Sequence, residues 1–368
     1  MEAPLAPISA EQSVNPRLIA PYLRERIGVG IRSAYNVTVN PNKTLSPADT
    51  TYDFELPIFQ QSLVDVKRMT LVVGGRLMRR RIDGTYGMIP DAAGAAEPAI
   101  VANNLVYTLF RDVTVHIGAN QEPFHQPLHP YKCDIKTLLK YKDNHAAAAS
   151  LQGFGVEFED VSGYKSTIGR ISHFRGSKYA EFAGETMIDL FDTPGYMKSG
   201  VPIRITYTRT TPEFYMIQDE KTKQNVYRFE ISKISLQVPV IKVTETLVPE
   251  MESLCKTAPA RYHFESINAK QYLLGVDTRI TEFPKVFTCR IPQRLVICFY
   301  KQKTLAGDVL ENPFLTSSDI KIRSLQIIHN GLVLNNIQPH FETGSYSCCY
   351  KAFLDFVGAN DESYMIGK

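Results

Sequence analysis

The sequence has no tryptophan and no apolar run near the roughly 20 residues that a membrane-spanning helix needs. Sugar sites often stack the ring on tryptophan, so its absence counts against a carbohydrate-binding module. The first residues, M-E-A-P-L-A-P-I-S-A-E-Q, lack a basic region followed by an apolar core, which is the pattern of a secretory signal. We therefore expect a protein made inside the cell, without a transmembrane segment.

The sequence also lacks a large excess of charge of one sign. Among the 368 residues, 41 lysines and arginines face 38 acidic residues, for a net charge of +3. That balance does not supply the concentrated basic surface that nonspecific nucleic-acid binding needs. A short cluster, Arg76, Arg79, Arg80 and Arg81, has no aromatic residues between its members. It predicts a solvated or subunit-facing loop rather than a nucleic-acid site.

Signatures of catalysis and of metal binding are missing as well. The sequence has no G-x-S-x-G motif, no phosphate-binding G-x-x-x-x-G-K-[ST] loop and no C-x-x-C pair. His125 and His129 are one helical turn apart, but H-Q-P-L-H-P contains two prolines, so we expect no regular helix there. We predict no catalytic, cofactor-binding or metal-binding residue, no cofactor, and no enzymatic activity. The cysteines are expected to be reduced and buried: Cys133, Cys255, Cys289, Cys298, Cys348 and Cys349.

What the sequence does contain is a succession of short strands, separated by 22 glycines and 22 prolines. In T-Y-D-F-E-L the apolar residues Tyr52, Phe54 and Leu56 alternate with acidic ones, as in a half-buried strand. Further strands are expected at 66–75, 112–118, 185–191, 202–208, 284–299 and 322–331. Short helices are expected at 131–141 and 247–256, and long loops at 76–98 and 144–175.

One predicted strand, Val226–Val243, changes the parity of its apolar residues. Phe229 and Ile231 share one face of a regular strand, whereas Ile234 and Leu236 share the other. A single extra residue near Ser232 or Lys233 would return all of them to one buried face, so the pattern predicts a β-bulge.

The order of several segments is similar to that of one protein family. In the first half these are A-N-N-L-V-Y-T-L-F-R-D-V-T-V-H-I-G, H-P-Y-K-C-D-I-K-T-L-L-K-Y and P-I-R-I-T-Y-T-R-T-T-P-E-F-Y-M-I. In the second half they are V-Y-R-F-E-I-S-K-I-S-L-Q-V-P-V-I-K-V, T-A-P-A-R-Y, P-K-V-F-T-C-R-I-P-Q-R-L-V-I-C-F, E-N-P-F and I-R-S-L-Q-I-I-H-N-G. The chain resembles the double-jelly-roll major capsid proteins of Polinton/Maverick elements and adintovirus-like viruses, including their copies in animal genomes.

The resemblance implies an all-β fold of two tandem antiparallel jelly-roll sandwiches. It implies an N-terminal arm and lead-in at residues 1–49, a first jelly roll at 50–217, a linker at 218–225 and a second jelly roll at 226–368. The implied function is structural. Homotrimers with a pseudo-hexameric outline would tile an icosahedral shell, in contact with neighbouring capsomers and with a minor capsid or penton protein. The implied location is the virion, after synthesis in the nucleus or cytoplasm of the host.

Three alternatives remain open at this point. The chain could be a jelly-roll binding module for a protein or carbohydrate, a cupin-like metalloenzyme, or a decayed genomic copy that no longer assembles. Family members continue past Tyr364–Lys368 with further strands, so the second jelly roll is expected to be incomplete, with an unpaired edge and exposed apolar surface.

Overall fold

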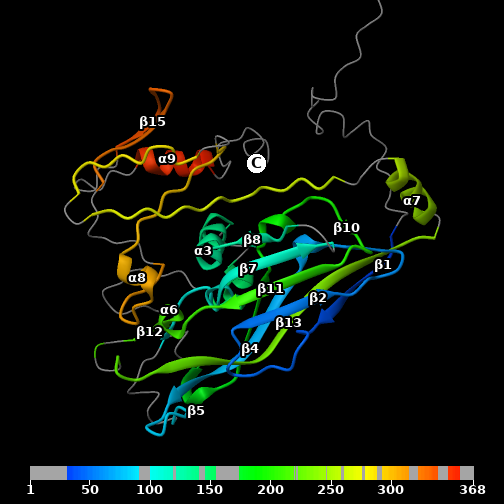
Figure 1. The fold of residues 1–368 in the computed structure, drawn as a ribbon, viewed down its shortest axis with the longest axis horizontal. Coiled ribbons are helices and arrows are strands. Elements are labelled where there is room, and N and C mark those ends of the chain that lie inside the picture. Colours follow the sequence, from blue (N-terminus) through cyan, green and yellow to red (C-terminus); the bar gives the residue numbers. More distant parts are fainter. Residues whose placement is uncertain are drawn as a thin grey trace, which may run out of the picture.

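The structure is a computed structural model. It describes residues 31–90, 100–118, 122–140, 146–154, 174–218, 220, 223–245, 247–257, 261–275, 278–287, 292–314, 322–338 and 347–356. Two sheets packed face to face dominate it (Figure 1). All strand pairs in the described residues are antiparallel, which confirms the predicted all-β class.

The larger sheet has seven strands and the smaller one has four. The larger comprises β1 (Ile31–Val39), β3 (Ser62–Val64), β4 (Thr70–Arg80), β5 (Tyr86–Met88), β9 (Ala180–Glu185), β10 (Met197–Lys198) and β13 (Tyr227–Val243). The smaller comprises β2 (Thr51–Leu56), β7 (Phe110–Ile117), β8 (Phe124–Gln126) and β11 (Ile203–Arg209). A short pair, β6 (Ile100–Val101) with β12 (Met216–Ile217), lies beside them.

The pairing of eight strands defines a jelly roll. In chain order these are β1, β2, β4, β7, β8, β9, β11 and β13. The first pairs with the eighth, the second with the seventh, the third with the sixth and the fourth with the fifth. The sheets are completed by β13 beside β4 and by β11 beside β7. A long hairpin rolled up into two sheets has this order, so the strand pairing alone identifies the fold.

The predicted bulge in β13 is confirmed. Its pairing with β4 shifts between Ile231 and Lys233, and the exposed Ser232 is the extra residue. On either side of it, Ile231 and Ile234 are both buried. Pro239 lies opposite the gap between two partner strands, since pairing with β4 ends at Gln237 and pairing with β3 begins at Val240. A proline lacks the backbone donor that a continuous ladder would need there.

The core between the sheets is aromatic and aliphatic. From the smaller sheet, Phe54, Phe110 and Tyr207 are fully buried and meet edge to face or tilted, with ring centroids 5.1–6.0 Å apart. The predicted burial of Tyr52, Phe54 and Leu56 on one face of β2 is confirmed. Buried side chains from the larger sheet complete this layer: Leu71, Val73, Leu77, Phe229, Leu236, Val238 and Val240.

The predicted domain boundaries differ from the sheet pairing at two places. Residues 31–39, assigned to the N-terminal arm at 1–49, form β1, the first strand of the jelly roll; residues 1–30 lie outside the described residues. β13, assigned to the second jelly roll at 226–368, is the eighth strand of the first one. The jelly roll expected at 50–217 therefore extends from 31 to 243. The linker expected at 218–225 falls within these bounds. Of its described residues, Gln218 Nε2 donates to Asn225 O at 3.0 Å.

Three other local predictions also need correction. The loop expected at 76–98 is strand as far as Arg80, because β4 continues to pair with β13 and β5. Of the strand expected at 185–191, only Glu185 is strand, at the end of β9, and a turn of 3-10 helix, η5 (Asp189–Phe191), follows. In 284–299, the described residues 284–287 and 292–299 are not paired as strands, and several of their apolar side chains are exposed by a third or more.

The helices are short, and two of them, α2 (Leu105–Thr108) and α3 (His129–Lys140), pack against β7 of the smaller sheet. The longest is α3, close to the expected 131–141, and α7 (Leu247–Thr257) matches the helix expected at 247–256. The others are α4 (Ala146–Leu151), α6 (Pro212–Tyr215), α8 (Gln302–Ala306) and α9 (Ser347–Phe356), with 3-10 turns η1 (Val66–Arg68) and η4 (Arg175–Ser177). Within the part of the chain that the structure describes, no helix is both long and apolar enough to span a bilayer.

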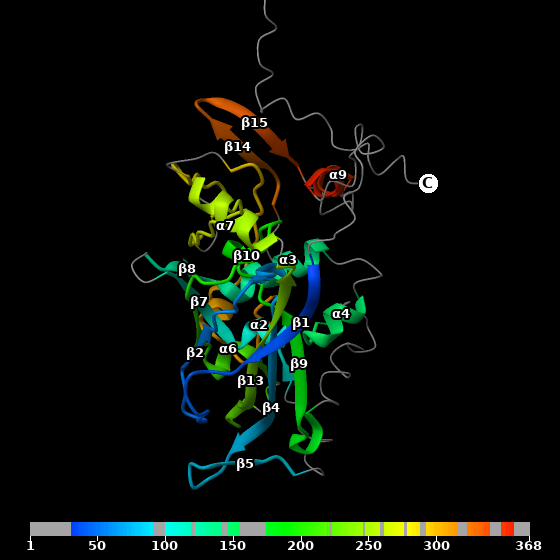
Figure 2. The same cartoon turned by 90° about the vertical axis from the view of Figure 1, so that its right-hand side faces the viewer.

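After α7 the chain crosses the end of the jelly roll that carries α3. Residues 261–275 run extended past α3, and α8 lies beside α6 (Figure 1). The expected strand at 322–331 is found as β14 (Leu325–His329), in a hairpin with β15 (Leu332–Ile337). The hairpin and α9 lie at the end of the molecule opposite β5 (Figure 1 and Figure 2).

Candidate functional site

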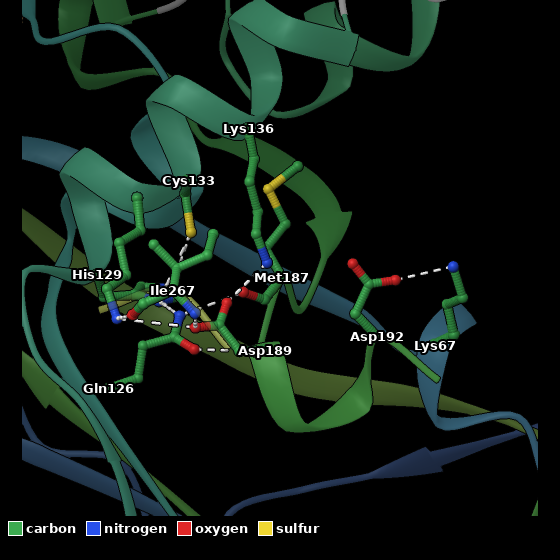
Figure 3. Close-up of polar contacts among 10 residues, drawn as sticks. Lys67, Gln126, His129, Cys133, Lys136, Met187, Asp189, Asp192 and Ile267 are labelled. Atoms are coloured by element: carbon green, nitrogen blue, oxygen red, sulfur yellow. Dashed lines mark hydrogen bonds and ion pairs between the residues drawn. The ribbon is translucent and has the colours of Figure 1, made fainter. Parts of the chain in front are cut away.

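The most concentrated chemistry in the described residues is a buried polar cluster under α3. Residues at i, i+3, i+4 and i+7 of a helix share one face. In α3 this spacing brings His129, Lys132, Cys133 and Lys136 towards the jelly roll, where η5 presents Asp189 (Figure 3). The cluster forms because β8 ends just before α3 begins, and because the chain after β9 passes next to this helix at η5.

Asp189 is the centre of the cluster, and its side chain is fully buried. Lys136 Nζ lies 2.8 Å from Oδ1, and Lys132 Nζ lies 3.7 Å from Oδ2. Oδ2 also accepts the backbone N–H of Ile267 at 3.0 Å, from a segment 78 residues further along the chain. Two cations and a backbone donor thus surround one carboxylate. These contacts compensate for the loss of water around the buried charge.

Lys132 links the jelly roll to the segment that contains Ile267. Its Nζ donates to the backbone oxygen of Ile267 at 2.7 Å while it faces Asp189. Burial lowers the pKa of this lysine from its usual value, and the nearby Asp189 charge opposes that shift. Lys132 and Asp189 together therefore hold both backbone groups of Ile267, as a strand partner would.

Gln126 extends the network to His129. Its Oε1 accepts the backbone N–H of Asp189 at 2.9 Å, so its amide nitrogen is the donor to Met187 O at 3.2 Å and to His129 Nδ1 at 2.9 Å. With Nδ1 accepting, the neutral imidazole carries its proton on Nε2. The Gln126 amide thus forms hydrogen bonds with His129 and with the backbone of Met187 and Asp189.

A cysteine and a histidine in contact invite a catalytic interpretation. Cys133 Sγ lies 3.5 Å from both ring nitrogens of His129. However, both side chains are fully buried, burial lowers the pKa of His129 to about 3, and burial raises the pKa of Cys133 well above its usual value. A reactive cysteine needs a thiolate and access to substrate. This pair is a neutral thiol beside a neutral imidazole, packed in the core.

In the described residues, the later part of the chain contacts the jelly roll at this cluster and at two further places. At the second, Lys198 N donates to Tyr262 Oη at 3.1 Å, and Phe264 packs edge to face on Phe124 with centroids 6.1 Å apart. At the third, Tyr131 of α3 contacts Tyr300 and Phe314, with centroids 4.9 and 5.7 Å away. The third also includes a backbone hydrogen bond of 2.6 Å from Gln218 N to Val309 O.

The histidines and arginines that the sequence analysis considered for metal or nucleic-acid binding do not form one site in the described residues. His125 is exposed on β8, where its Nδ1 lies 3.2 Å from Thr114 Oγ1, whereas His129 is buried at the start of α3. The helix begins there despite the prolines, because Pro130 occupies its first turn, where no backbone donor is needed. In the described residues, no three His, Cys, Asp or Glu side chains gather as a metal site would require. Arg76 and Arg80 are exposed on β4, and Arg81 follows it.

Asp189, Lys132 and Lys136 were not singled out from the sequence. Asp189 falls in a segment predicted as strand, where an acidic residue on the outer face is ordinary. The spacing Lys132–Lys136 did place two cations one helical turn apart on the face that also carries Cys133 and His129. Buried cations need anionic partners, so this signal could have indicated a missing carboxylate.

The solved structures that resemble this chain include two from viruses. No family model and no curated protein matches the sequence. A chain from the cryo-EM structure of the Sputnik virophage is 13% identical, over 67% of this chain and 55% of its own length, with a TM-score of 0.37. The Faustovirus major capsid protein is 10% identical, over 61% of this chain and 56% of its own length, with a TM-score of 0.34. The chain spans about half the length of each.

Proposed function

We propose that this chain is a structural capsid protein of the double-jelly-roll type, without enzymatic activity. The observation that carries the proposal is the complete eight-stranded jelly roll closed by β13, a fold used for viral shells as well as for lectins and cupins. The order of the sequence segments resembles that of capsid proteins, and this favours a shell protein over a lectin or a cupin. The most conspicuous polar cluster is committed to internal pairing, which agrees with a structural role.

The finer assignment follows the sequence resemblance to Polinton/Maverick and adintovirus-like capsid proteins. The chain after β13 belongs to a second jelly roll, and three chains form a pseudo-hexameric homotrimer. Trimers tile an icosahedral shell in the virion, with a minor capsid or penton protein as a further partner. Closed cyclic symmetry is an economical way to satisfy one repeated contact.

The distribution of exposed apolar side chains supports an assembled state. Large apolar side chains exposed by more than a third concentrate in the later part of the chain, and such surface usually marks an interaction site. They include Tyr272, Leu273, Ile280, Val296, Ile297, Ile328, Leu332, Val333, Leu334, Tyr350 and Phe353. Lateral contacts between capsid subunits would bury this surface.

Sedimentation and negative-stain imaging of the purified chain test the proposal. We expect a species at three times the chain mass of 41.5 kDa, and hexagonal sheets at high concentration. A chain that remains monomeric at high concentration, with and without residues 1–30, contradicts the capsid assignment. Stoichiometric zinc or iron that is lost on replacing His125 and His129 would instead favour the cupin-like enzyme.

A further inference from the structure

The strand β1 is an unusual edge. Among the described residues it pairs with β13 on one side only, and it forms one edge of the larger sheet. It has nine residues, whereas the other edge strands of the two sheets have six or fewer. An unpaired edge presents a row of backbone donors and acceptors that can pair with another strand.

Proteins usually protect such an edge with proline, charge, shortness or a β-bulge. In β1 the one register shift lies between Ile31 and Ser33, at the start of the strand, and the pairing from Ser33 to Val39 is regular. β2 carries Asp53 and Glu55, and β9 carries Glu181 and Glu185, so these edges are protected by charge. β1, I-R-S-A-Y-N-V-T-V, has no proline and no acidic residue or lysine. Its one charge, on Arg32, faces Glu245 of the same chain at 3.2 Å.

The edge is apolar on the side that faces the core. Val37 is opposite Val238 and Tyr35 is opposite Val240, and both partners in β13 are fully buried. Tyr35 itself is 45% exposed, because nothing described covers its outer side. A strand added beside β1 would therefore continue the hydrophobic layer of the jelly roll as well as its hydrogen-bond ladder.

We propose that β1 pairs antiparallel with β1 of a second copy of this chain, about a two-fold axis at Tyr35. The sequence is compatible with itself in this register. Ser33 would face Val37 on one side and Ala34 would face Asn36 on the other, so no like charges meet. The regular part of the strand begins at Ser33, because the pairing with β13 shifts between Ile31 and Ser33. An isologous two-fold contact needs this self-complementarity. The larger sheets of the two copies would become one continuous sheet.

The contact is expected to be weak in isolation. Stable interfaces use about 20–30 residues on each side, and β1 offers nine. It would therefore act together with other contacts or at high local concentration. The proposal does not depend on a capsid function, because it concerns this edge alone.

Site-specific cross-linking of the full chain tests both the contact and its register. Tyr35→Cys would place two thiols directly opposite each other, about 5 Å apart. The two Ser33 positions would be four residues apart along the strands, or about 13 Å. With a bis-thiol reagent shorter than that distance, Tyr35→Cys should cross-link to a dimer. Ser33→Cys alone should not, but should do so when mixed with Val37→Cys.

The parent chain, treated identically, gives the background from native cysteines such as the exposed Cys298. If Tyr35→Cys does not fold, as judged by its melting curve, Ala34→Cys mixed with Asn36→Cys replaces it in the same register. Equal yields from Ser33→Cys and Tyr35→Cys, or yields no greater than the parent's, would overturn the proposal.

A charge variant provides a second, independent readout. Tyr35→Glu would place two carboxylates opposite each other at the axis, so the Ser33→Cys/Val37→Cys cross-link should fall about fivefold or more. Tyr196→Glu adds the same charge at another tyrosine that is 45% exposed, away from β1, and should leave the yield unchanged. An unchanged yield with Tyr35→Glu contradicts pairing at this edge. The trimer mass is measured separately, so either proposal can fail without the other.

Discussion

At the scale of single residues, Asp189 holds two segments that are distant in sequence. Its carboxylate neutralises Lys136 and Lys132 in the interior and accepts the Ile267 N–H. A buried ion pair contributes little net stability relative to apolar side chains of similar size, but removing one partner leaves an uncompensated buried charge. The cluster therefore determines where residue 267 is placed more than it stabilises the fold.

Replacing Asp189 with asparagine tests this role. The variant keeps an acceptor for Ile267 but leaves the buried Lys132 and the partly buried Lys136 without the Asp189 charge, so the free energy of unfolding should fall by about 3–5 kcal/mol. Denaturant titration measures the loss. The matched control is Asp192→Asn, which removes a more exposed pair with Lys67 at 2.8 Å and should cost no more than about 1 kcal/mol. Equal losses of stability in the two variants would contradict this role for Asp189.

His129 makes the stability depend on pH. Burial lowers its pKa to about 3, with Lys136 and Lys132 adding to the effect, whereas the unfolded chain titrates near 6.5. The unfolded state therefore binds the proton more tightly, and stability is lost as pH falls from about 6.5 towards 3. At pH 5 this residue alone should account for about 2 kcal/mol.

Unfolding free energies at pH 7.5 and pH 5 measure this contribution. His129→Gln should be less stable at neutral pH but should show a smaller loss on acidification than the wild type. His125→Gln, on an exposed site of β8, should keep the wild-type dependence. A His129→Gln chain with the same loss between the two pH values would show that other groups are responsible.

At the scale of elements, the bulge in β13 is matched by glycines in β4. Gly75 is opposite Ile231 and Gly74 is opposite Lys233, so they flank the register shift. A Cβ at Gly75 would lie 2.2 Å from the Glu230 backbone oxygen and 2.9 Å from the buried Phe229 ring. The two strands approach closely there because no side chain separates them.

Gly75→Ala should therefore destabilise the chain by about 1–3 kcal/mol, since neither a backbone carbonyl nor a core ring can move freely. Gly74→Ala is the matched control. Its Cβ would meet the hydroxyl of Tyr179, which is 45% exposed and can turn away. Thermal melts of both variants compare the two positions. A larger shift for Gly74→Ala would contradict this account of the close approach.

Sequence patterns predicted the elements whose periodicity is local. The alternation in β2 and the parity change in β13 both depend on neighbours within a few residues, and each is found in the structure. The boundary at 218–225 could not be found in this way. A polar loop before a long strand looks the same whether that strand opens a second sandwich or closes the first. Only the partners of β13 decide, and they lie far away in the sequence.

The Asp189 cluster escaped prediction for the same reason. Ile267 contributes backbone atoms to it, and a backbone N–H has no signature in the sequence. The two lysines carried a signal, but their partner was hidden in a segment whose pattern was typical of a strand. The predicted absence of metal or catalytic residues remains a prediction.

At the scale of the whole molecule, aromatic rings attach the later part of the chain to the jelly roll. Tyr131 is 9% exposed and contacts Phe214, Tyr300 and Phe314, with ring centroids 4.9–5.7 Å away. Two of these rings, Tyr300 and Phe314, belong to the segment that contains α8. Aromatic packing of this kind supplies large buried area as well as a preferred geometry.

Tyr131→Ala should release this segment while the jelly roll stays folded. We expect faster amide hydrogen exchange and faster proteolysis in residues 292–314, and a loss of stability of about 3–5 kcal/mol if unfolding remains cooperative. Tyr272→Ala is the matched control, since Tyr272 is 42% exposed and its ring packs at a tilt against Phe283 within its own region. Uniformly faster exchange across β4 and β13 would show that Tyr131 supports the whole sandwich instead.

The pairing of β1 with β13 also bears on how the protein is made. Ile31 lies opposite Val243, so the first and last strands of the jelly roll are 212 residues apart in the chain. Contacts between such distant residues fold slowly, because a long loop must close before they can form. On the ribosome, at about 5–20 residues per second, β1 and β4 would wait at least about 10 seconds for the strand that lies between them. During that interval the two long strands are open to pairing with other chains, so synthesis of this protein should depend strongly on chaperones that bind exposed strands.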